Sequence, residues 1–279
     1  MKTPEQLKGA IRNVAKKNNL MPQEVLQMFL FERILERLSV SQYKNNFILK
    51  GGLLISSMIG ITERTTMDMD TTVKGIPMEE DVICDIVKEI VAIDVGDGIE
   101  FEFVKIEPIR EDDAYNNFRI HIKAIYGKMN NPMKIDITTG DKITPAAIEY
   151  SYKMMFEDKK VPVMAYTLET ILAEKYETII RRNIGTTRVR DFYDLYILFQ
   201  SRKNEVRKEI LNIAVNHTAA KRGSFDDLKE YKEICEELRS EEALQKLWEN
   251  YIKENVYAAH LRYQDMVDNV LMVGQFINE

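Results

Sequence analysis

The hydrophobic pattern of the chain changes character near Val161–Tyr166, and this change restricts the folds that the chain can adopt. Before it, short stretches with strand-like alternation are interleaved with stretches of helical spacing. After it, apolar residues recur every three or four positions almost to the end. The 279 residues suffice for two domains of ordinary size. We therefore predict an α+β protein, with a sheet-containing domain over residues 1–165 and an all-helical domain over residues 166–279.

The first domain is predicted to contain both kinds of element. Helical spacing covers residues 4–40, where Pro22 suits the first turn of a helix because its missing N–H is not needed there. Shorter helices are expected over Leu53–Ile59 and Met78–Ala92. Strand patterns cover Phe47–Lys50, Thr65–Val73, Ile99–Ile109, Phe118–Tyr126 and Met133–Thr138.

The composition excludes several classes of protein. Hydrophobic residues make up 45% of the chain, which is enough for a core and too much for a disordered protein. No apolar run approaches the roughly 18 residues that a membrane helix needs, and no apolar signal segment follows the N-terminus. Cys84 and Cys235 are too few for a disulfide scaffold or a zinc site. We expect a cytoplasmic protein without a membrane partner.

Charge is distributed unevenly along the chain. The formal net charge is −6, yet the segment Lys175–Arg222 holds eleven basic and five acidic residues. Residues 226–279 hold six basic and thirteen acidic ones. The low net charge is therefore no argument against a polyanionic partner such as RNA, because the basic segment is the part that would bind it.

The most informative motif joins Lys50-Gly51-Gly52 to Asp68-Met69-Asp70. Two carboxylates at positions i and i+2 of a strand point to the same face, and a bound cation relieves their repulsion. Mg²⁺ prefers such oxygen ligands together with substrate phosphates. A glycine pair that opens a helix presents backbone N–H groups to an anion such as a phosphate. The combination predicts phosphoryl or nucleotidyl transfer, whereas D-x-D alone is more typical of a solvated strand or loop.

A third carboxylate is expected on a neighbouring strand. Asp136 stands between Ile135 and Ile137, so strand alternation directs its side chain away from the layer of core that the isoleucines join. We predict that Asp136 joins Asp68 and Asp70 as a ligand of Mg²⁺, or of Mn²⁺ in its place.

These motifs resemble those of the AbiEii/AbiGii-type nucleotidyltransferase toxins, a branch of the DNA polymerase β-like nucleotidyltransferase superfamily. The usual turn of the superfamily is Gly-Ser, and this chain has Gly51-Gly52 in its place. The ordered stretches that carry the resemblance lie within residues 47–199 and are Leu49-Lys-Gly-Gly52, Arg64-Thr-Thr66-Met-Asp68-Met-Asp70, Glu174-Lys175 and Arg190-Asp191-Phe-Tyr-Asp194-Leu.

The resemblance implies a fold and an activity. The fold is the polymerase β-like mixed sheet flanked by helices, followed by a helical domain. The activity is Mg²⁺-dependent transfer of a nucleoside monophosphate from an NTP to an acceptor, with the 3′ end of tRNA as the expected acceptor. Such a protein is the toxin of a type IV toxin–antitoxin or abortive-infection system that serves in phage defence, and its antitoxin is encoded nearby.

The resemblance also assigns roles to individual residues. Residues expected to act in the transfer are Asp68, Asp70, Lys175, Asp191 and Asp194. Residues expected to contact the nucleotide are Lys50, Gly51, Gly52, Arg64, Thr66 and Arg190.

The residues themselves leave alternatives open in the second half. Lys175 borders an apolar helix face, where a lysine often extends its stem over the apolar surface and serves no site. Asp191 and Asp194 share an apolar face, so they are expected to meet a cation, either Lys175 or an arginine. That contact is a structural ion pair, a part of the nucleotide site, or both.

Two further groups have two interpretations each. Arginines at 181, 182, 188 and 190 surround a turn and form either a solvated face or a grip on phosphates. Tyr193 and Tyr196 either stack on a base or belong to the core. At the level of function, a non-catalytic nucleotide-binding or protein-interaction module and a metal-dependent nuclease remain as alternatives to the transferase.

Overall fold

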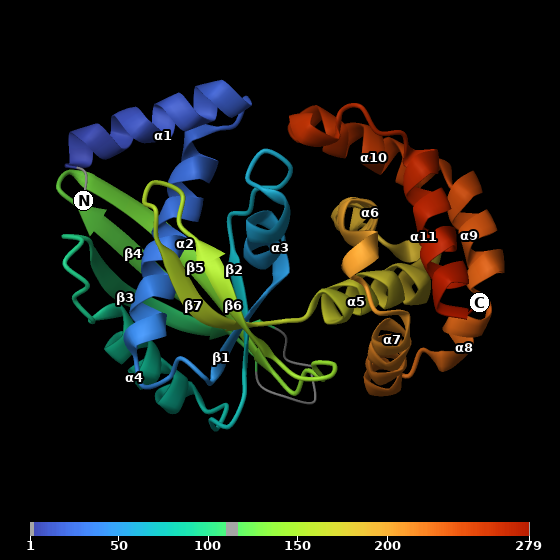
Figure 1. Ribbon diagram of the computed structural model, residues 1–279, viewed down its shortest axis with the longest axis horizontal. Coiled ribbons are helices and arrows are strands. Elements are labelled where there is room, and N and C mark those ends of the chain that lie inside the picture. Colours follow the sequence, from blue (N-terminus) through green and yellow to red (C-terminus); the bar gives the residue numbers. More distant parts are fainter. Residues whose placement is uncertain (1–2, 110–116, 279) are drawn as a thin grey trace. The chain divides into compact units, whose positions relative to one another are not determined.

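The computed structural model describes residues 3–109 and 117–278, and these divide into two compact units (Figure 1). The N-terminal unit comprises Met1–Asp141 and Ile148–Ala165, and the C-terminal unit comprises Lys142–Ala147 and Tyr166–Glu279. The short segment Lys142–Ala147 is bound to the helices that follow it in the chain. The Thr144 amide donates to the Thr170 hydroxyl at 2.9 Å, and the Thr167 hydroxyl donates to the Thr144 carbonyl at 2.7 Å.

Within the described residues, the N-terminal unit is built on a seven-stranded sheet of order β3-β4-β5-β2-β1-β7-β6. The pairs β1–β7 and β2–β5 are parallel, and the other neighbours are antiparallel. This mixed sheet confirms the predicted α+β class. The strands are β1 (Phe47–Lys50), β2 (Met69–Val73), β3 (Glu100–Pro108), β4 (Phe118–Tyr126), β5 (Met129–Thr139), β6 (Ile148–Lys153) and β7 (Lys160–Ala165).

The strands β6 and β7 were not predicted, and they lie at one edge of the sheet. Proline inside a strand pattern argues against a strand, and β7 contains Pro162. The structure accommodates Pro162 because β1 pairs with β7 only at Met164 and Ala165, beyond the proline. The segment at which the hydrophobic pattern changes, near Val161–Tyr166, therefore lies largely within a strand.

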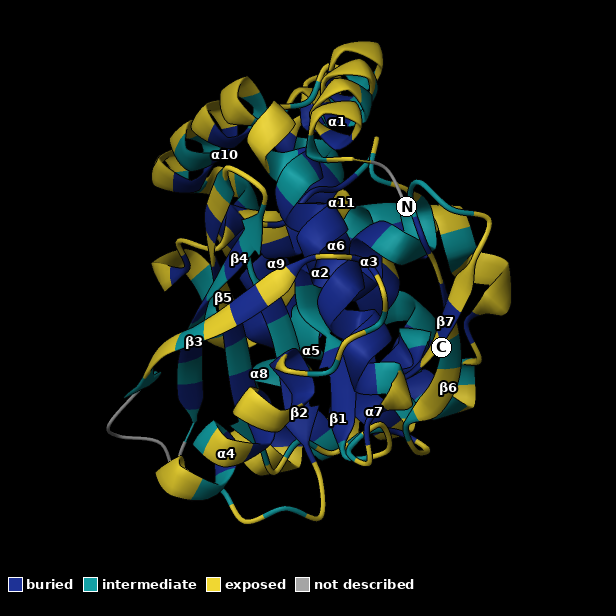
Figure 2. Ribbon diagram, turned by 90° about the vertical axis from the view of Figure 1, so that its left-hand side faces the viewer, coloured by how far each residue is buried: buried dark blue, intermediate teal, exposed yellow. Residues whose placement is uncertain are grey.

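Helices of the N-terminal unit differ strongly in burial. α2 (Pro22–Val40) is buried along most of its length, and it packs on β7 and α4 (Glu80–Val91). α1 (Pro4–Asn18) buries only Leu7, Ile11 and Ala15. Figure 2 shows this contrast as a dark blue α2 beside a largely yellow α1. α3 (Gly51–Ile59) packs on β1 and β2 and so continues directly from the strand that it contacts.

The C-terminal unit consists of helices around a core of large aromatic and aliphatic side chains, as predicted for this part of the chain. Gly274 allows two of these helices to approach closely, since a Cβ there would lie 2.6 Å from Cε2 of Tyr231. Trp248 is the only tryptophan of the sequence and is buried in this unit. The helices are α5 (Leu168–Arg182), α6 (Val189–Arg202), α7 (Lys208–Arg222), α8 (Phe225–Lys229), α9 (Tyr231–Ser240), α10 (Glu242–Glu254) and α11 (Tyr263–Asn278).

Candidate functional site

The glycine pair forms the junction between β1 and α3 and lies directly against the D-x-D motif. Gly51 has a φ of +66°, a conformation that favours glycine, and a Cβ at this position would lie 2.7 Å from Cγ of Asp70. A Cβ on Gly52 would lie 2.8 Å from Oγ1 of Thr66 and 3.0 Å from Nη2 of Arg64. A side chain on Gly51 would displace the Asp70 carboxylate, and one on Gly52 would displace Thr66 or Arg64. The two motifs therefore form one structural feature.

Arg64 and Thr66 organise the approach to β2. The buried guanidinium of Arg64 donates to the carbonyl of Thr65. The Thr66 hydroxyl accepts from the Asp68 amide at 3.3 Å and donates to the Asp68 carbonyl at 3.1 Å. These contacts fix a turn where the sequence predicted a strand from Thr65, and β2 begins only at Met69. Asp68 thus lies in the turn and Asp70 in the strand, both half-buried.

Asp70 is the middle member of a row of polar residues across three strands. It is in register with Lys50 on β1 and with Asp136 on β5. The Lys50 ammonium binds the Asp141 carboxylate at 2.5 Å, and Asp141 also accepts from Thr138 at 3.2 Å. Lys50 was predicted to contact a nucleotide, and in this structure its charge is compensated by Asp141.

Asp136 is held by an arginine that the sequence analysis did not single out. Arg119 on β4 donates to both carboxylate oxygens of Asp136, with distances of 2.8 Å and 2.8 Å. This bidentate contact is the main cause that raises the pKa of Arg119 above its ordinary value, and the charge of Asp68 adds to it. No group of three or more His, Cys, Asp or Glu side chains within residues 3–109 and 117–278 is arranged to hold a metal ion.

The donor set nevertheless fits a hard divalent cation. Mg²⁺ commonly takes one or two carboxylates from the protein and completes its shell with substrate phosphates and water. Asp68 and Asp70 supply such a pair beside the start of α3, and Asp136 would have to leave Arg119 to join them. Mg²⁺ at this position would be held by two protein carboxylates, and the remaining ligands would come from the substrate.

A pocket of about 490 Å³ adjoins Asp68. It lies over β3, β4 and β5, and Gln27 of α2 also reaches it. Its polar side chains include His121, Lys123 and Lys134. Met67 and Val104 add two exposed apolar side chains to its wall. The pocket belongs wholly to the N-terminal unit.

Lys175, Asp191 and Asp194 form a buried cluster within the C-terminal unit. The Lys175 ammonium lies 2.6 Å from Asp191 and 2.8 Å from Asp194, as the sequence analysis expected for one of its alternatives. The carboxylates are 3% and 0% exposed, which makes their neutralisation essential. Arg188 adds a second cation to Asp191 at 2.6 Å. Both the lysine and an arginine therefore compensate this pair of carboxylates.

The pKa shifts of the cluster agree with its geometry. Burial has the largest single effect and raises the pKa of Asp191, but Lys175 and Arg188 together outweigh it and leave this pKa below its ordinary value of 3.8. Burial lowers the pKa of Lys175, but the two carboxylates outweigh it and leave that pKa above its ordinary value of 10.5. The charged forms of both partners are therefore the stable ones.

Most cations of the basic segment are neutralised locally. Arg181 and Arg222 both bind Glu177, whose side chain is fully buried. Arg207 binds Glu169 at 3.0 Å. Arg190 is exposed at the start of α6. The structure thus favours the solvated-face interpretation for Arg181 and leaves Arg190 accessible to a ligand.

The two tyrosines of α6 differ. Tyr193 is buried, with its ring centroid 5.0 Å from that of Tyr257, so it belongs to the core. Tyr196 is half-buried. Base stacking on Tyr193, one of the two interpretations, is incompatible with its burial.

The predicted site residues are thus divided between two groups, each held by its own unit. The N-terminal group consists of Lys50, Gly51, Gly52, Arg64, Thr66, Asp68, Asp70 and Asp136, and the C-terminal group of Lys175, Arg190, Asp191 and Asp194. Sequence reasoning missed Arg119 and Asp141, whose partners are set by strand register and by the end of β5. The only local signal was the polar alternation of Arg119, His121 and Lys123 along β4.

Comparisons with known proteins relate this geometry to a family. Residues 33–269 match the family model described as nucleotidyl transferase AbiEii toxin, type IV TA system. A structure described as a nucleotidyltransferase from H. pylori is similar with a TM-score of 0.53 and 14% identity, over 92% of this chain and 96% of that one. JHP933 from Helicobacter pylori is similar with the same TM-score and identity, over 92% and 93% of the two chains. At this identity the two structures show the fold.

One curated protein matches over a shorter stretch. It is a glutamine–fructose-6-phosphate aminotransferase from Clostridium perfringens, 28% identical over 167 residues, which is 58% of this chain and 26% of the enzyme. The chain therefore spans about a quarter of that relative. Among the described residues, no helix is long and apolar enough to cross a membrane.

Proposed function

The chain belongs to the AbiEii nucleotidyl transferase toxin family of type IV toxin–antitoxin systems, and we propose that it transfers a nucleoside monophosphate from an NTP to a hydroxyl of RNA. The 3′ end of tRNA is the proposed acceptor, and Mg²⁺ is the proposed cofactor. The observation that carries the proposal is the contact between the glycine pair and the carboxylate of Asp70. It joins a turn suited to phosphates to a carboxylate suited to a divalent cation.

The glycine pair and the D-x-D motif have different parts in the proposed reaction. The acceptor hydroxyl oxygen forms a bond to the α-phosphorus, the bond between that phosphorus and the bridging oxygen of pyrophosphate breaks, and the hydroxyl proton passes to solvent or a nearby base. When bound, Mg²⁺ would offset the negative charge of the phosphates. Backbone N–H groups at Gly51 and Gly52 would orient the triphosphate, and Thr66 would hold Asp68 in position through its turn.

The family motif supports a part for Lys175 in charge compensation at the nucleotide, beside its part in the core of its own unit. Its ammonium is already compensated by Asp191 and Asp194, so only part of its charge is available to a phosphate. Arg190 belongs to the same motif and is exposed at the start of the helix that carries both aspartates. We propose Arg190 as the second cation that the nucleotide meets.

The test is incubation of the protein with total tRNA, Mg²⁺ and each labelled NTP, followed by gel analysis of RNA length. We expect the label to enter RNA and the RNA to lengthen. Asp68→Ala should abolish labelling with an unchanged circular dichroism spectrum, since Asp68 lies in a half-buried turn. Asp158→Ala, an exposed carboxylate between β6 and β7, is the matched control and should label RNA normally.

Other outcomes distinguish the alternatives. Unchanged labelling in Asp68→Ala would contradict the assignment of this residue. Stabilisation by NTP without any labelling would favour a non-catalytic nucleotide-binding module, since ligand binding alone raises the melting temperature. Shortened RNA would favour a metal-dependent nuclease.

The proposed partner is an antitoxin protein encoded beside this chain, as the type IV system of the family implies. We expect expression of the chain alone to arrest growth and coexpression of the neighbouring gene to relieve the arrest. Growth arrest that Asp68→Ala fails to remove would separate toxicity from the proposed transfer.

A further inference from the structure

The pocket beside Asp68 has a composition that suits a nucleotide chain. Lys123 and Lys134 contribute cations, Met67 and Val104 contribute exposed apolar surface, and Asn130 adds an exposed amide. A mostly apolar wall with a few placed polar groups is typical of small-molecule and nucleotide pockets. Asp68 is both a wall of this pocket and a member of the carboxylate pair.

The cations of the pocket are available to an incoming anion. Lys134 is exposed and makes no ion pair with the residues that the structure describes. Lys123 binds Glu102, and His121 binds Glu107 at 2.8 Å, but both glutamates are more than a third exposed. Ion pairs with an exposed carboxylate are weak, so a phosphate can replace Glu102 at Lys123.

Strand order places this pocket opposite the glycine pair. β2, which carries Asp70, lies between β1 and β5 in the sheet. The glycine pair follows β1 on one side, and the pocket extends over β5, β4 and β3 on the other. In phosphoryl transfer the attacking and leaving oxygens lie roughly in line on opposite sides of the phosphorus. Donor phosphates at the glycine pair therefore leave the pocket side to the acceptor.

We propose that this pocket binds the 3′-terminal nucleotides of a single-stranded RNA acceptor, with Lys134 and Lys123 at backbone phosphates and Met67 and Val104 against a base. The terminal hydroxyl would then lie at Asp68. This inference rests on the proposed transferase function, because that function requires an acceptor beside the carboxylate pair. It assigns the acceptor to residues of the N-terminal unit and leaves the basic segment of the C-terminal unit without a required part in this contact.

Direct binding tests the pocket without any chemistry. The probe is a short fluorescein-labelled single-stranded RNA with a free 3′-hydroxyl, whose anisotropy is followed with the full-length protein at several salt concentrations and without NTP. Each lost phosphate contact on a single strand reduces the magnitude of the negative slope of log K against log salt by about 0.7. We expect that reduction for Lys134→Ala and for Lys123→Ala, and about twice that reduction for the double variant.

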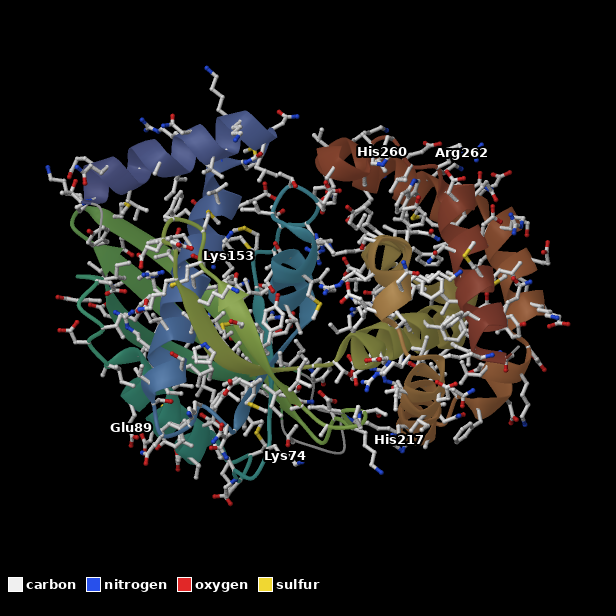
Figure 3. All side chains as sticks on the ribbon, viewed as in Figure 1. Lys74, Glu89, Lys153, His217, His260 and Arg262 are labelled. Atoms are coloured by element: carbon white, nitrogen blue, oxygen red, sulfur yellow. The ribbon has the colours of Figure 1, made fainter. Side chains whose placement is uncertain are left out.

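Lys74→Ala is the matched control. Lys74, labelled in Figure 3, is an exposed lysine that follows β2 at the end away from Asp68, and it lines no part of the pocket. Its variant should keep the wild-type slope. All variants should also keep the wild-type rise in melting temperature on addition of NTP, since the lysines are assigned to the acceptor and not to the donor.

Three results would overturn the proposal. The first is wild-type RNA binding in the double variant, and the second is no measurable RNA binding by the wild type. The third is loss of the NTP-induced stabilisation in Lys134→Ala, which would place the donor in the pocket. Failure of the transferase function has a different signature: RNA binding would depend on Lys134 and Lys123, while the wild type would transfer no label to that RNA.

Discussion

The protein contains two pairs of aspartates that differ in what balances their charge. Asp191 and Asp194 are buried, and Lys175 and Arg188 neutralise them within the same unit. Asp68 and Asp70 are half-buried beside the glycine pair, and Asp68 takes part in no ion pair with the described residues. Full burial without a cation is too costly for a carboxylate, so the buried pair needs its fixed partners, whereas the half-exposed Asp68 can take a cation from solution.

This difference predicts that substitutions in the two pairs affect different properties, namely stability for the C-terminal pair and ligand binding for the N-terminal pair. The C-terminal pair contributes to stability through its fixed cations. Asp68 is proposed to bind a ligand and is expected to add little to stability, because it takes part in no ion pair with the described residues. Local geometry therefore separates a structural carboxylate pair from one that is proposed to bind metal, although both occur in motifs that the family resemblance marks as functional.

The largest effect is expected for Lys175→Met. Methionine keeps the apolar stem but leaves two buried carboxylates without the lysine, and breaking a buried ion pair costs about 3–5 kcal/mol. Urea unfolding followed by Trp248 fluorescence measures it, because the single tryptophan lies in the same unit.

Two companions sharpen the Lys175→Met result. The triple variant Lys175→Met/Asp191→Asn/Asp194→Asn should recover part of the lost stability, since it removes the uncompensated charges. Asp68→Asn, followed by circular dichroism, should change the free energy of unfolding by less than about 0.5 kcal/mol. Equal losses in Lys175→Met and Asp68→Asn would break the comparison between the two pairs.

A somewhat smaller effect is expected for Gly51→Ala. Its φ of +66° costs an L-residue about 1–2 kcal/mol, and the new Cβ also overlaps the Asp70 carboxylate. Overpacking of this kind adds about 1–3 kcal/mol, and the displaced carboxylate should also abolish transfer.

Gly96→Ala separates the two destabilising effects expected in Gly51→Ala, which are the positive φ and the overlap with the Asp70 carboxylate. Gly96 has a φ of +72°, but a Cβ there would meet open space. Its variant should lose only the backbone contribution and keep full labelling of RNA. A Gly51→Ala protein with normal transfer would show that the close approach to Asp70 has no part in the activity.

Sequence patterns predicted that the glycine pair and the carboxylates belong together. They lie within one stretch of chain, so their proximity follows from a strand, a helix and a return strand. The turn at Thr66 was not predicted, because the alternation of residues 65–73 is typical of a strand. The partner of Asp136 could not be predicted, because the Arg119 contact depends on the register of β4 against β5. A shift of one residue in that register would turn Arg119 to the other face.

The edge of the sheet was missed for a related reason. β7 pairs with β1 although the two strands are far apart in the chain. Pro162 lies within β7, and a proline in a strand pattern argues against a strand. The sequence predicted that Asp191 and Asp194 meet a cation, since buried aspartates on an apolar helix face need one. Which cation they meet depends on the packing of α5 against α6, and the structure supplies two.

The pH dependence of stability gives a third, smaller test of the C-terminal pair. The pKa of Asp191 is lowered in the folded protein, so its contribution is fully present above the ordinary value of 3.8 and is lost as the pH falls from there through the folded value. Urea unfolding of the wild type should therefore lose stability in this acid range. Asp191→Asn should show a shallower loss, and identical pH profiles would contradict an Asp191 held by Lys175 and Arg188.

The smallest effect is expected for Asp136, which shares features of both pairs. It faces Asp70 in register, yet both of its oxygens bind Arg119, whose side chain is 34% exposed. Because solvent screens such a pair, Asp136→Asn should cost about 1 kcal/mol of stability. If Asp136 acts by orienting Arg119, the transfer rate should fall by about tenfold, equivalent to about 1.4 kcal/mol in the barrier. Complete loss of transfer, as expected for Asp68→Ala, would instead place Asp136 with the carboxylates that are proposed to bind metal and require that Arg119 release it when the substrates bind.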